Sequence, residues 1–160
     1  MNIVMDPHLR KVRIIADYQF GSGAGRALFG YDVTFQLSTT GRIRQIMHGK
    51  ERIATLRAGD NRFTLGKLGA LRLHAFLPYP KMRAVVNGDA APFIRQGKTA
   101  FARHIVDVDP MVRSGDEVLV VDETDDLLAT GQAKLCASEL LSFERGAGVD
   151  VRIGLGNKTV

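Results

Sequence analysis

The chain has 160 residues, 45% of them hydrophobic and 24% charged, which excludes a wholly disordered chain and suits one large or two small globular domains. No apolar run approaches the ~20 residues of a membrane-spanning helix, and the N-terminus lacks a secretory signal, so we expect a cytoplasmic protein without membrane contact. The single Cys136 has no Cys or His beside it, which argues against disulfides and structural zinc. We interpret it as a small buried hydrophobic residue.

The net charge of +5 is unevenly divided along the chain. Residues 1–87 contain 14 Lys and Arg against 5 Asp and Glu, a net +9, whereas residues 88–160 contain 8 against 12, a net −4. A polyanion is therefore expected to be attracted mainly by the first half. A well-solvated surface explains the same charge equally well.

The first predicted element is a short amphipathic helix over residues 6–18. Asp6 can cap it, and Pro7 fits its first turn. The glycine-rich segment GSGAGR (21–26) resembles a dinucleotide-binding loop only superficially, because Arg26 replaces the third glycine and a helix precedes the segment. We predict a turn between two helices there.

Residues 31–78 are predicted to form an antiparallel sheet. Apolar residues recur at period two, with tight turns expected at 49–51 and 58–61. The expected strands cover residues 31–37, 43–47, 53–56, 63–65 and 71–76. Eight cations lie between or along them: Arg42, Arg44, Lys50, Arg52, Arg57, Arg62, Lys67 and Arg72. If several share a face they can follow a phosphate backbone; the alternative is that they are exposed strand positions that protect sheet edges.

The segment Pro78-Tyr79-Pro80 is stiff and is predicted to be extended, which makes it the best domain boundary. We therefore expect a basic module at 1–80, a second domain at 81–154 and a flexible tail at 155–160. The second domain alternates short apolar strands with tight turns, and its run Val118–Val121 has no polar face, as in a nearly closed barrel. The fold class is α+β: a small N-terminal module with an antiparallel sheet, then a barrel of about six strands with short helices.

Within this barrel, Asp89 is predicted to cap a short helix that ends at residue 96. Gly97 and Lys98 then turn the chain into a long strand, 99–106, which places Phe101 and Arg103 on one side. We expect Arg95, Lys98 and Arg103 to lie near one another where this helix meets the strand.

Catalytic signals are weak. The four histidines are scattered, and no Ser or Cys has the surroundings of an activated nucleophile. The carboxylates of residues 122–126 are expected to form a solvated hairpin turn, because acid-base catalysis needs a cleft that separates their pKa values. We predict no enzymatic activity, no metal and no cofactor.

Motifs of the second half resemble a known family. They are GKxxFAR (97–103), DP (109–110), RSGDEVLVV (113–121), AxGxA (129–133) and GxxVxVR (146–152). Together they resemble a PUA domain, the RNA-binding barrel named after pseudouridine synthases and archaeosine transglycosylases. Earlier motifs resemble the accessory C-terminal modules of archaeal tRNA-guanine transglycosylases and archaeosine synthases: ADYQFG (16–21), GAG (23–25), TGRIR (40–44) and FTL (63–65) followed by GA (69–70).

The resemblance runs from about residue 16 to residue 153 and implies a pre-PUA module followed by a PUA-type pseudo-barrel. In that family a catalytic barrel with a nucleophilic Asp and a Cys-rich zinc site precedes these modules, so the resemblance implies a chain that binds tRNA without modifying it. By family likeness, the first barrel helix and the next strand hold RNA. The RNA-binding residues implied are Arg95, Gly97, Lys98 and Arg103, with Arg152 on the closing strand. Because the barrel has a net negative charge, we expect Arg42 and Arg44 of the first module to contribute to RNA binding as well.

Two hypotheses follow. The first is an RNA-binding protein of archaeal type that recognises structured tRNA and serves as the non-catalytic module of a separate transglycosylase or archaeosine synthase subunit. The alternative is a protein-interaction subunit that docks on a catalytic partner, in tRNA modification or ribosome biogenesis, and contacts little RNA. A free-standing enzyme lacks a catalytic cluster to support it.

Overall fold

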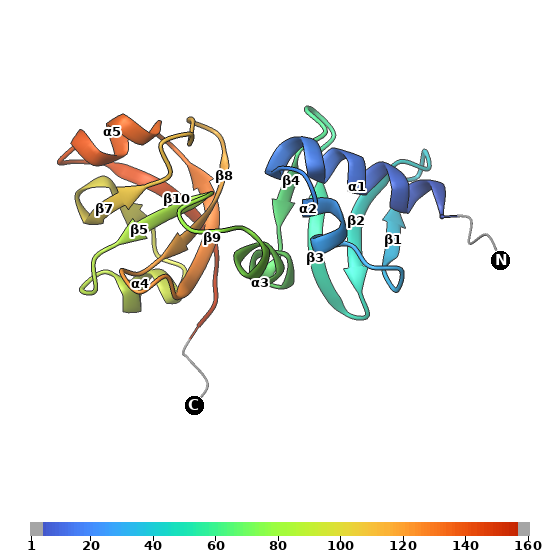
Figure 1. The fold of residues 1–160 in the computed structure, drawn as a ribbon, viewed down its shortest axis with the longest axis horizontal. Coiled ribbons are helices and arrows are strands. Elements are labelled where there is room, and N and C mark those ends of the chain that lie inside the picture. The colour runs from blue at the N-terminus through green and yellow to red at the C-terminus, as the bar shows by residue number, and fades with distance from the viewer. Residues whose placement is uncertain (1–4, 157–160) are drawn as a thin grey trace. The chain divides into compact units, whose positions relative to one another are not determined.

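The computed structural model describes residues 5–156. The chain forms two compact units, Met1–Phe76 and Leu77–Val160, each with its own core (Figure 1). The segment Pro78-Tyr79-Pro80 was predicted to be extended, but it is folded into turns, with Lys81 N donating to Pro78 O (2.9 Å) and Arg83 N to Pro80 O (3.0 Å). Within the described part of the chain, no helix has both the length and the apolar character needed to cross a bilayer.

The first helix, α1 (Pro7–Phe20), begins as the sequence predicts. The Asp6 carboxylate accepts a hydrogen bond from His8 N (2.7 Å), and Pro7 occupies the first turn, where its missing N–H costs nothing. The inward side chains recur every three or four residues and are buried: Leu9, Val12, Ala16 and Phe20. This spacing confirms an amphipathic helix, which ends two residues later than expected.

A short helix, α2 (Ala24–Leu28), follows the predicted glycine turn. Gly25 lies against α1 so closely that a Cβ would be 2.3 Å from Arg13 O, which no side chain can tolerate. Asp17 fixes the turn by accepting a hydrogen bond from Gly25 N (2.7 Å). Gly25 therefore serves helix packing, and the predicted turn between two helices is confirmed.

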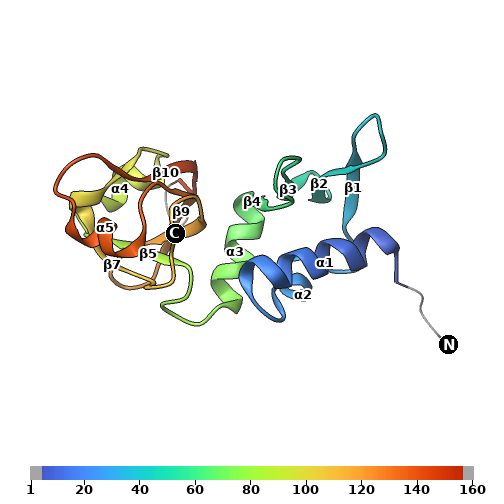
Figure 2. The same cartoon turned by 90° about the horizontal axis from the view of Figure 1, so that it is seen from above.

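The sheet of the first unit is antiparallel, in the order β1 (Thr34–Leu37), β2 (Ile43–His48), β3 (Glu51–Leu56) and β4 (Phe63–Leu65). Helices cover one face, as Figure 2 shows, and ring contacts such as His8 with Phe35 and Phe29 with Phe63 join the layers. On the opposite face a row of uncharged polar side chains crosses all four strands in register: Gln36, Gln45, Thr55 and Thr64.

The expected strand over residues 71–76 is wrong, because this segment belongs to helix α3 (Lys67–Phe76). The buried residues Gly69, Ala70 and Leu73 have helical spacing, which the neighbouring leucines obscured in the sequence. Gly69 packs on β3 with its Cβ position 2.2 Å from Ile53 O. Only a helix with glycine at this point can approach the β3 backbone so closely.

The second unit is a six-stranded, barrel-like sheet in the order β6, β10, β9, β8, β5, β7. The strands are β5 (Arg83–Val86), β6 (Ala100–Phe101), β7 (Ile105–Val108), β8 (Glu117–Val121), β9 (Leu127–Ala133) and β10 (Ala147–Gly154). Every residue of β8 is buried, which confirms the strand predicted to be covered on both faces. Helices α4 (Ala91–Arg95) and α5 (Ala137–Ser142) lie on opposite sides of this sheet in Figure 1.

Two local predictions for the barrel are wrong. The expected strand over residues 99–106 is interrupted by a 3-10 helix, η1 (Ala102–His104), which lies between β6 and β7. Asp89 does not cap α4; Asn87 instead accepts a hydrogen bond from Ala90 N (3.0 Å) through its side-chain oxygen. The 3-10 helix breaks the predicted strand, whereas the predicted helix forms as α4 without the Asp89 cap.

Two further differences concern Cys136 and the C-terminal segment. Cys136 is half-buried and caps α5, where Glu139 accepts a hydrogen bond from its backbone N–H (3.1 Å), so it is not a core residue. Leu155 and Gly156, assigned to a flexible tail, donate backbone hydrogen bonds to Leu128 (2.9 Å) and Arg95 (2.8 Å). Residues 157–160 of that predicted tail lie outside the described residues.

Candidate nucleic-acid interface

The edge of the barrel formed by β6 and β10 carries most of the predicted RNA-binding residues. At one end, Gly97 lies beside Gly154, whose Cβ position is 2.6 Å from Gly97 N. At the other end, Phe101 pairs with Ala147, at the start of β10. Phe101 is four residue steps along the chain from Gly97, so this edge spans at most about 14 Å, roughly four nucleotides of a stacked strand.

Arg95, Lys98 and Arg103 lie on three successive segments along this edge. Arg95 ends α4 and donates to Gly156 O (3.5 Å). Lys98 is exposed in the turn that follows, and Gly97 in the same turn has a φ of 92°, a conformation that glycine adopts without strain. Arg103 lies on η1, beyond β6. Cations spaced along an edge can each contact a different phosphate of an RNA backbone.

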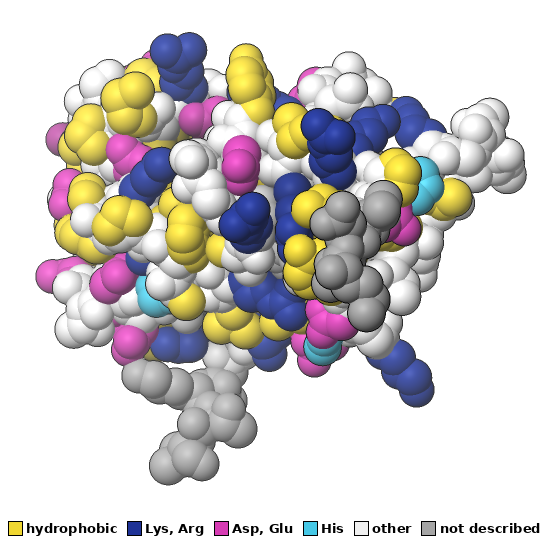
Figure 3. Space-filling model, turned by 45° about the vertical axis from the view of Figure 1, so that its right-hand side comes forward, with side chains coloured by type: hydrophobic (Ala, Val, Ile, Leu, Met, Phe, Trp, Pro, Cys, Tyr) yellow, Lys and Arg dark blue, Asp and Glu magenta, His cyan; other side chains and the backbone are white. Residues whose placement is uncertain are grey.

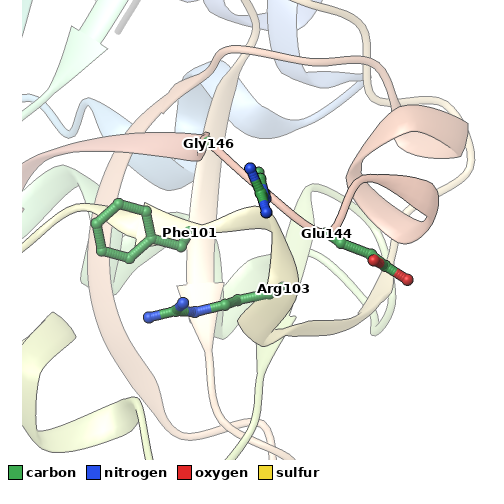
Figure 4. A pocket seen from close by; sticks show the side chains of 5 residues that line it. Phe101, Arg103, Glu144 and Gly146 are labelled. Atoms are coloured by element: carbon green, nitrogen blue, oxygen red, sulfur yellow. The ribbon is translucent and has the colours of Figure 1, made fainter.

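A shallow hollow lies next to Arg103. It measures about 340 Å³ and is lined by Phe101, Arg103, Glu144, Arg145 and Gly146. The Arg103 guanidinium lies 5.5 Å from the centroid of the Phe101 ring, a cation–π distance. In Figure 4 the side chains of Phe101 and Arg103 extend to the same side, whereas the Glu144 carboxylate points away from them.

Arg152 has a different environment. Both terminal nitrogens of its guanidinium donate to the Glu117 carboxylate, one at 2.8 Å to Oε2 and the other to Oε1. The Glu117 side chain is only 4% exposed, and that of Arg152 is 31% exposed. The guanidinium therefore compensates a buried charge inside the barrel.

The cations of the first unit also divide into two groups. Arg42 and Arg44, in and after the β1–β2 turn, are exposed, and neither forms an ion pair within residues 5–156. In contrast, Arg57 pairs with Asp60 (2.6 Å), Arg52 donates to Thr55 (2.8 Å) and Arg72 donates to Leu28 O (2.6 Å). Some of the eight cations predicted between residues 42 and 72 therefore have partners within the fold. Many other Lys and Arg side chains reach the surface (Figure 3).

The acidic hairpin between β8 and β9 interacts electrostatically with Arg95, at one end of the edge. Burial raises the pKa of Asp122, but hydrogen bonds from Asp126 and Thr124 and the charge of Arg95 hold this pKa below its ordinary value. Asp125 forms an ion pair with Arg83 (3.1 Å), whose side chain is 2% exposed. No three His, Cys, Asp or Glu side chains of the described residues are gathered where a metal ion could bind.

Sequence reasoning missed Phe101 and Arg145 as site residues. Phe101 was part of a quoted motif, and its 44% exposure is the feature that distinguishes it from a core residue. No sequence spacing connects it with Arg145. Only the pairing of β6 with β10 brings the loop before β10 to the side of Phe101.

Comparison with known proteins identifies families for both units of the chain. Residues 10–80 match the family model described as the patch-forming domain C2 of tRNA-guanine transglycosylase, and residues 82–155 match that of the PUA domain. The tRNA-guanine(15) transglycosylase of Methanothermobacter thermautotrophicus is 49% identical over 147 residues, and that of Pyrococcus furiosus is 48% identical over 147. These matches cover 91% and 92% of this chain but only 22% and 25% of the relatives.

Solved structures share the fold at low sequence identity. A hypothetical protein from Pyrococcus horikoshii has a TM-score of 0.70 at 22% identity, covering 94% of this chain and 91% of its own. A conserved PUA domain protein from Thermoplasma acidophilum has a TM-score of 0.62 at 20% identity, covering 98% and 93%. The chain therefore consists of a C2 patch-forming domain and a PUA domain, and it belongs with the homologous C-terminal part of archaeal tRNA-guanine(15) transglycosylases.

Proposed function

We propose that this chain is a non-catalytic RNA-binding module that recognises structured tRNA for an archaeosine-type modification reaction in the cytoplasm. The observation that carries the proposal is the exposed edge of β6 and β10, where Lys98 and Arg103 point cationic groups to solvent beside a glycine turn. Homology to part of a tRNA-guanine(15) transglycosylase supports tRNA as the RNA. On this proposal, RNA binding involves Arg95, Gly97, Lys98 and Arg103 and, in the first unit, Arg42 and Arg44.

A salt titration of binding to transcribed tRNA tests this proposal. Each phosphate contact releases counterions, so Lys98→Ala is expected to weaken binding and to reduce the slope of log K against log salt by about one. The matched control is Lys81→Ala, because Lys81 is an exposed lysine of the same unit that precedes β5, a strand that pairs with neither β6 nor β10. Binding that does not saturate, or that is independent of salt, would show that the chain is not an RNA-binding module.

A second candidate function is docking on a catalytic chain. On the outer face of α1, Ile14 is 58% and Tyr18 is 92% exposed, one helical turn apart. The chain spans about a quarter of the length of the relatives that it matches. The occupant that we propose for this face is therefore the catalytic part of a tRNA-guanine(15) transglycosylase.

Size-exclusion chromatography with a purified catalytic part tests the docking function. We expect co-elution that the pair Ile14→Asp and Tyr18→Asp abolishes. Co-elution that this double variant leaves intact would exclude α1 as the docking face, and separate elution of the unaltered proteins would exclude the partner.

A further inference from the structure

The hollow beside Phe101 has the composition of a small, selective binding site. Its volume of about 340 Å³ lies at the lower end of the range for small-molecule sites, so it suits one compact group and not a folded surface. Phe101 is 44% exposed although it belongs to a strand, and the Arg103 guanidinium lies over one face of its ring, 5.5 Å from the centroid. A ligand that covers this ring would remove apolar surface from water.

The charges of the lining select an anion. Arg103 and Arg145 contribute two positive charges and Glu144 one negative charge, so the lining is net positive. The Glu144 carboxylate also points away from Phe101 and Arg103 (Figure 4). Guanidinium groups bind phosphate through paired hydrogen bonds, and an aromatic ring beside them offers a stacking surface. A planar ring joined to a phosphate satisfies both, and a nucleotide has this chemistry.

The geometry further requires that the nucleotide be unpaired. A base inside an A-form helix is covered on both faces by its neighbours and cannot stack on a protein ring. Phe101 is the aromatic residue among the five that line the hollow, and because Arg103 lies over one face of its ring, only the other face is left for a single base. Gly146 has a φ of 91° and open space where a Cβ would be, so an RNA backbone can pass close to the chain there.

We propose that this hollow binds one unpaired nucleotide of the RNA, with the base stacked on Phe101 and the phosphate held by Arg103 and Arg145. This inference rests on the proposed RNA-binding function and goes beyond it, because it assigns the base contact to Phe101 and a phosphate contact to Arg145. The other cations of the edge then hold the neighbouring backbone.

Fluorescence of 2-aminopurine in short RNA stem-loops tests the assignment. One RNA carries 2-aminopurine as a single unpaired 3′ nucleotide, and a control RNA carries it inside the stem. The unaltered protein is expected to change the fluorescence of the unpaired probe only. Phe101→Ala is expected to abolish that change and to weaken binding of the overhang RNA about tenfold, the usual scale of base–aromatic stacking. Phe101→Tyr keeps the ring and is expected to restore both.

Control variants separate this inference from the proposed function. Phe143→Ala removes an aromatic side chain of similar exposure, 45%, that does not line the hollow, and is expected to change nothing. Circular dichroism checks that each variant is folded. If folded Phe101→Ala retains the fluorescence change while Lys98→Ala weakens binding, the nucleotide site is refuted and the RNA-binding function stands. If the unaltered protein binds neither RNA, both are refuted.

Discussion

Replacing Arg152 by alanine is expected to destabilise the barrel more than it weakens RNA binding. The replacement leaves the Glu117 carboxylate, only 4% exposed, without the guanidinium that now faces it. Breaking a buried ion pair costs about 3–5 kcal/mol. Because the Arg152 side chain is 31% exposed, solvent screening lowers our expectation to about 2–3 kcal/mol. For a unit of this size, that corresponds to a fall in Tm of roughly 10–20 °C.

Because Glu117 is more buried than Arg152, replacing one residue of the pair is expected to cost a different amount of stability from replacing the other. Glu117→Gln leaves a partly exposed guanidinium that water can solvate, so we expect this variant to lose less stability than Arg152→Ala. Replacing both residues by Met removes both charges and is expected to recover most of the loss. Native-state hydrogen exchange of the β8 amides is a suitable measurement, because β8 lies wholly in the barrel core.

Two results for Arg152→Ala would contradict this prediction. If Arg152→Ala leaves the protection of β8 amides within about 0.5 kcal/mol of the unaltered protein, the pair does not stabilise the fold and our reasoning is wrong. If RNA affinity falls at unchanged stability, the sequence-based assignment of Arg152 to RNA contact is supported.

Two further changes test other parts of the barrel. Gly154→Ala would place a Cβ 2.3 Å from Arg95 O and 2.6 Å from Gly97 N, so it should displace the end of α4 and lower both Tm and RNA affinity, by about 1–3 kcal/mol in stability. Glu139→Gln should lose more stability at pH 7 than at pH 3: hydrogen bonds from Cys136 lower the Glu139 pKa from 4.5, so the stabilisation is present above that pH and is lost as pH falls through the folded-state pKa. Urea titrations at the two pH values measure this difference.

The elements that the sequence predicted well are those in which local pattern and tertiary environment agree. The helix cap at Asp6 and the uninterrupted apolar run of β8 are local signals, and the structure retains both. Residues 71–76 were mispredicted because their apolar spacing is compatible with both helix and strand. The close contact of Gly69 with the β3 backbone decides for the helix, and that contact is not local in sequence.

The residues of the candidate site also differ in whether the local sequence predicts them. The edge containing Gly97, Lys98 and Arg103 was predicted from the motif that these residues form, because they are close in sequence. The role of Arg145 depends on strand pairing between segments more than 40 residues apart, and the pairing of Arg152 with Glu117 depends on side chains of β10 and β8. Single-sequence reasoning recognises charge and motif, but it does not reveal which arginine is already bound by a carboxylate.

The distribution of charge explains why an aromatic contact matters in this protein. Residues 1–76 hold 12 Lys and Arg against 5 Asp and Glu, whereas residues 77–160 hold 10 against 12. Long-range attraction of RNA therefore comes mainly from the first unit and weakens as salt screens it. Stacking on Phe101 is a short-range contact that salt does not screen in this way. On the proposed function, a barrel with a net negative charge would select an RNA that the basic unit attracts, because its selectivity would rest on stacking and on a few well-placed guanidinium groups and not on overall charge.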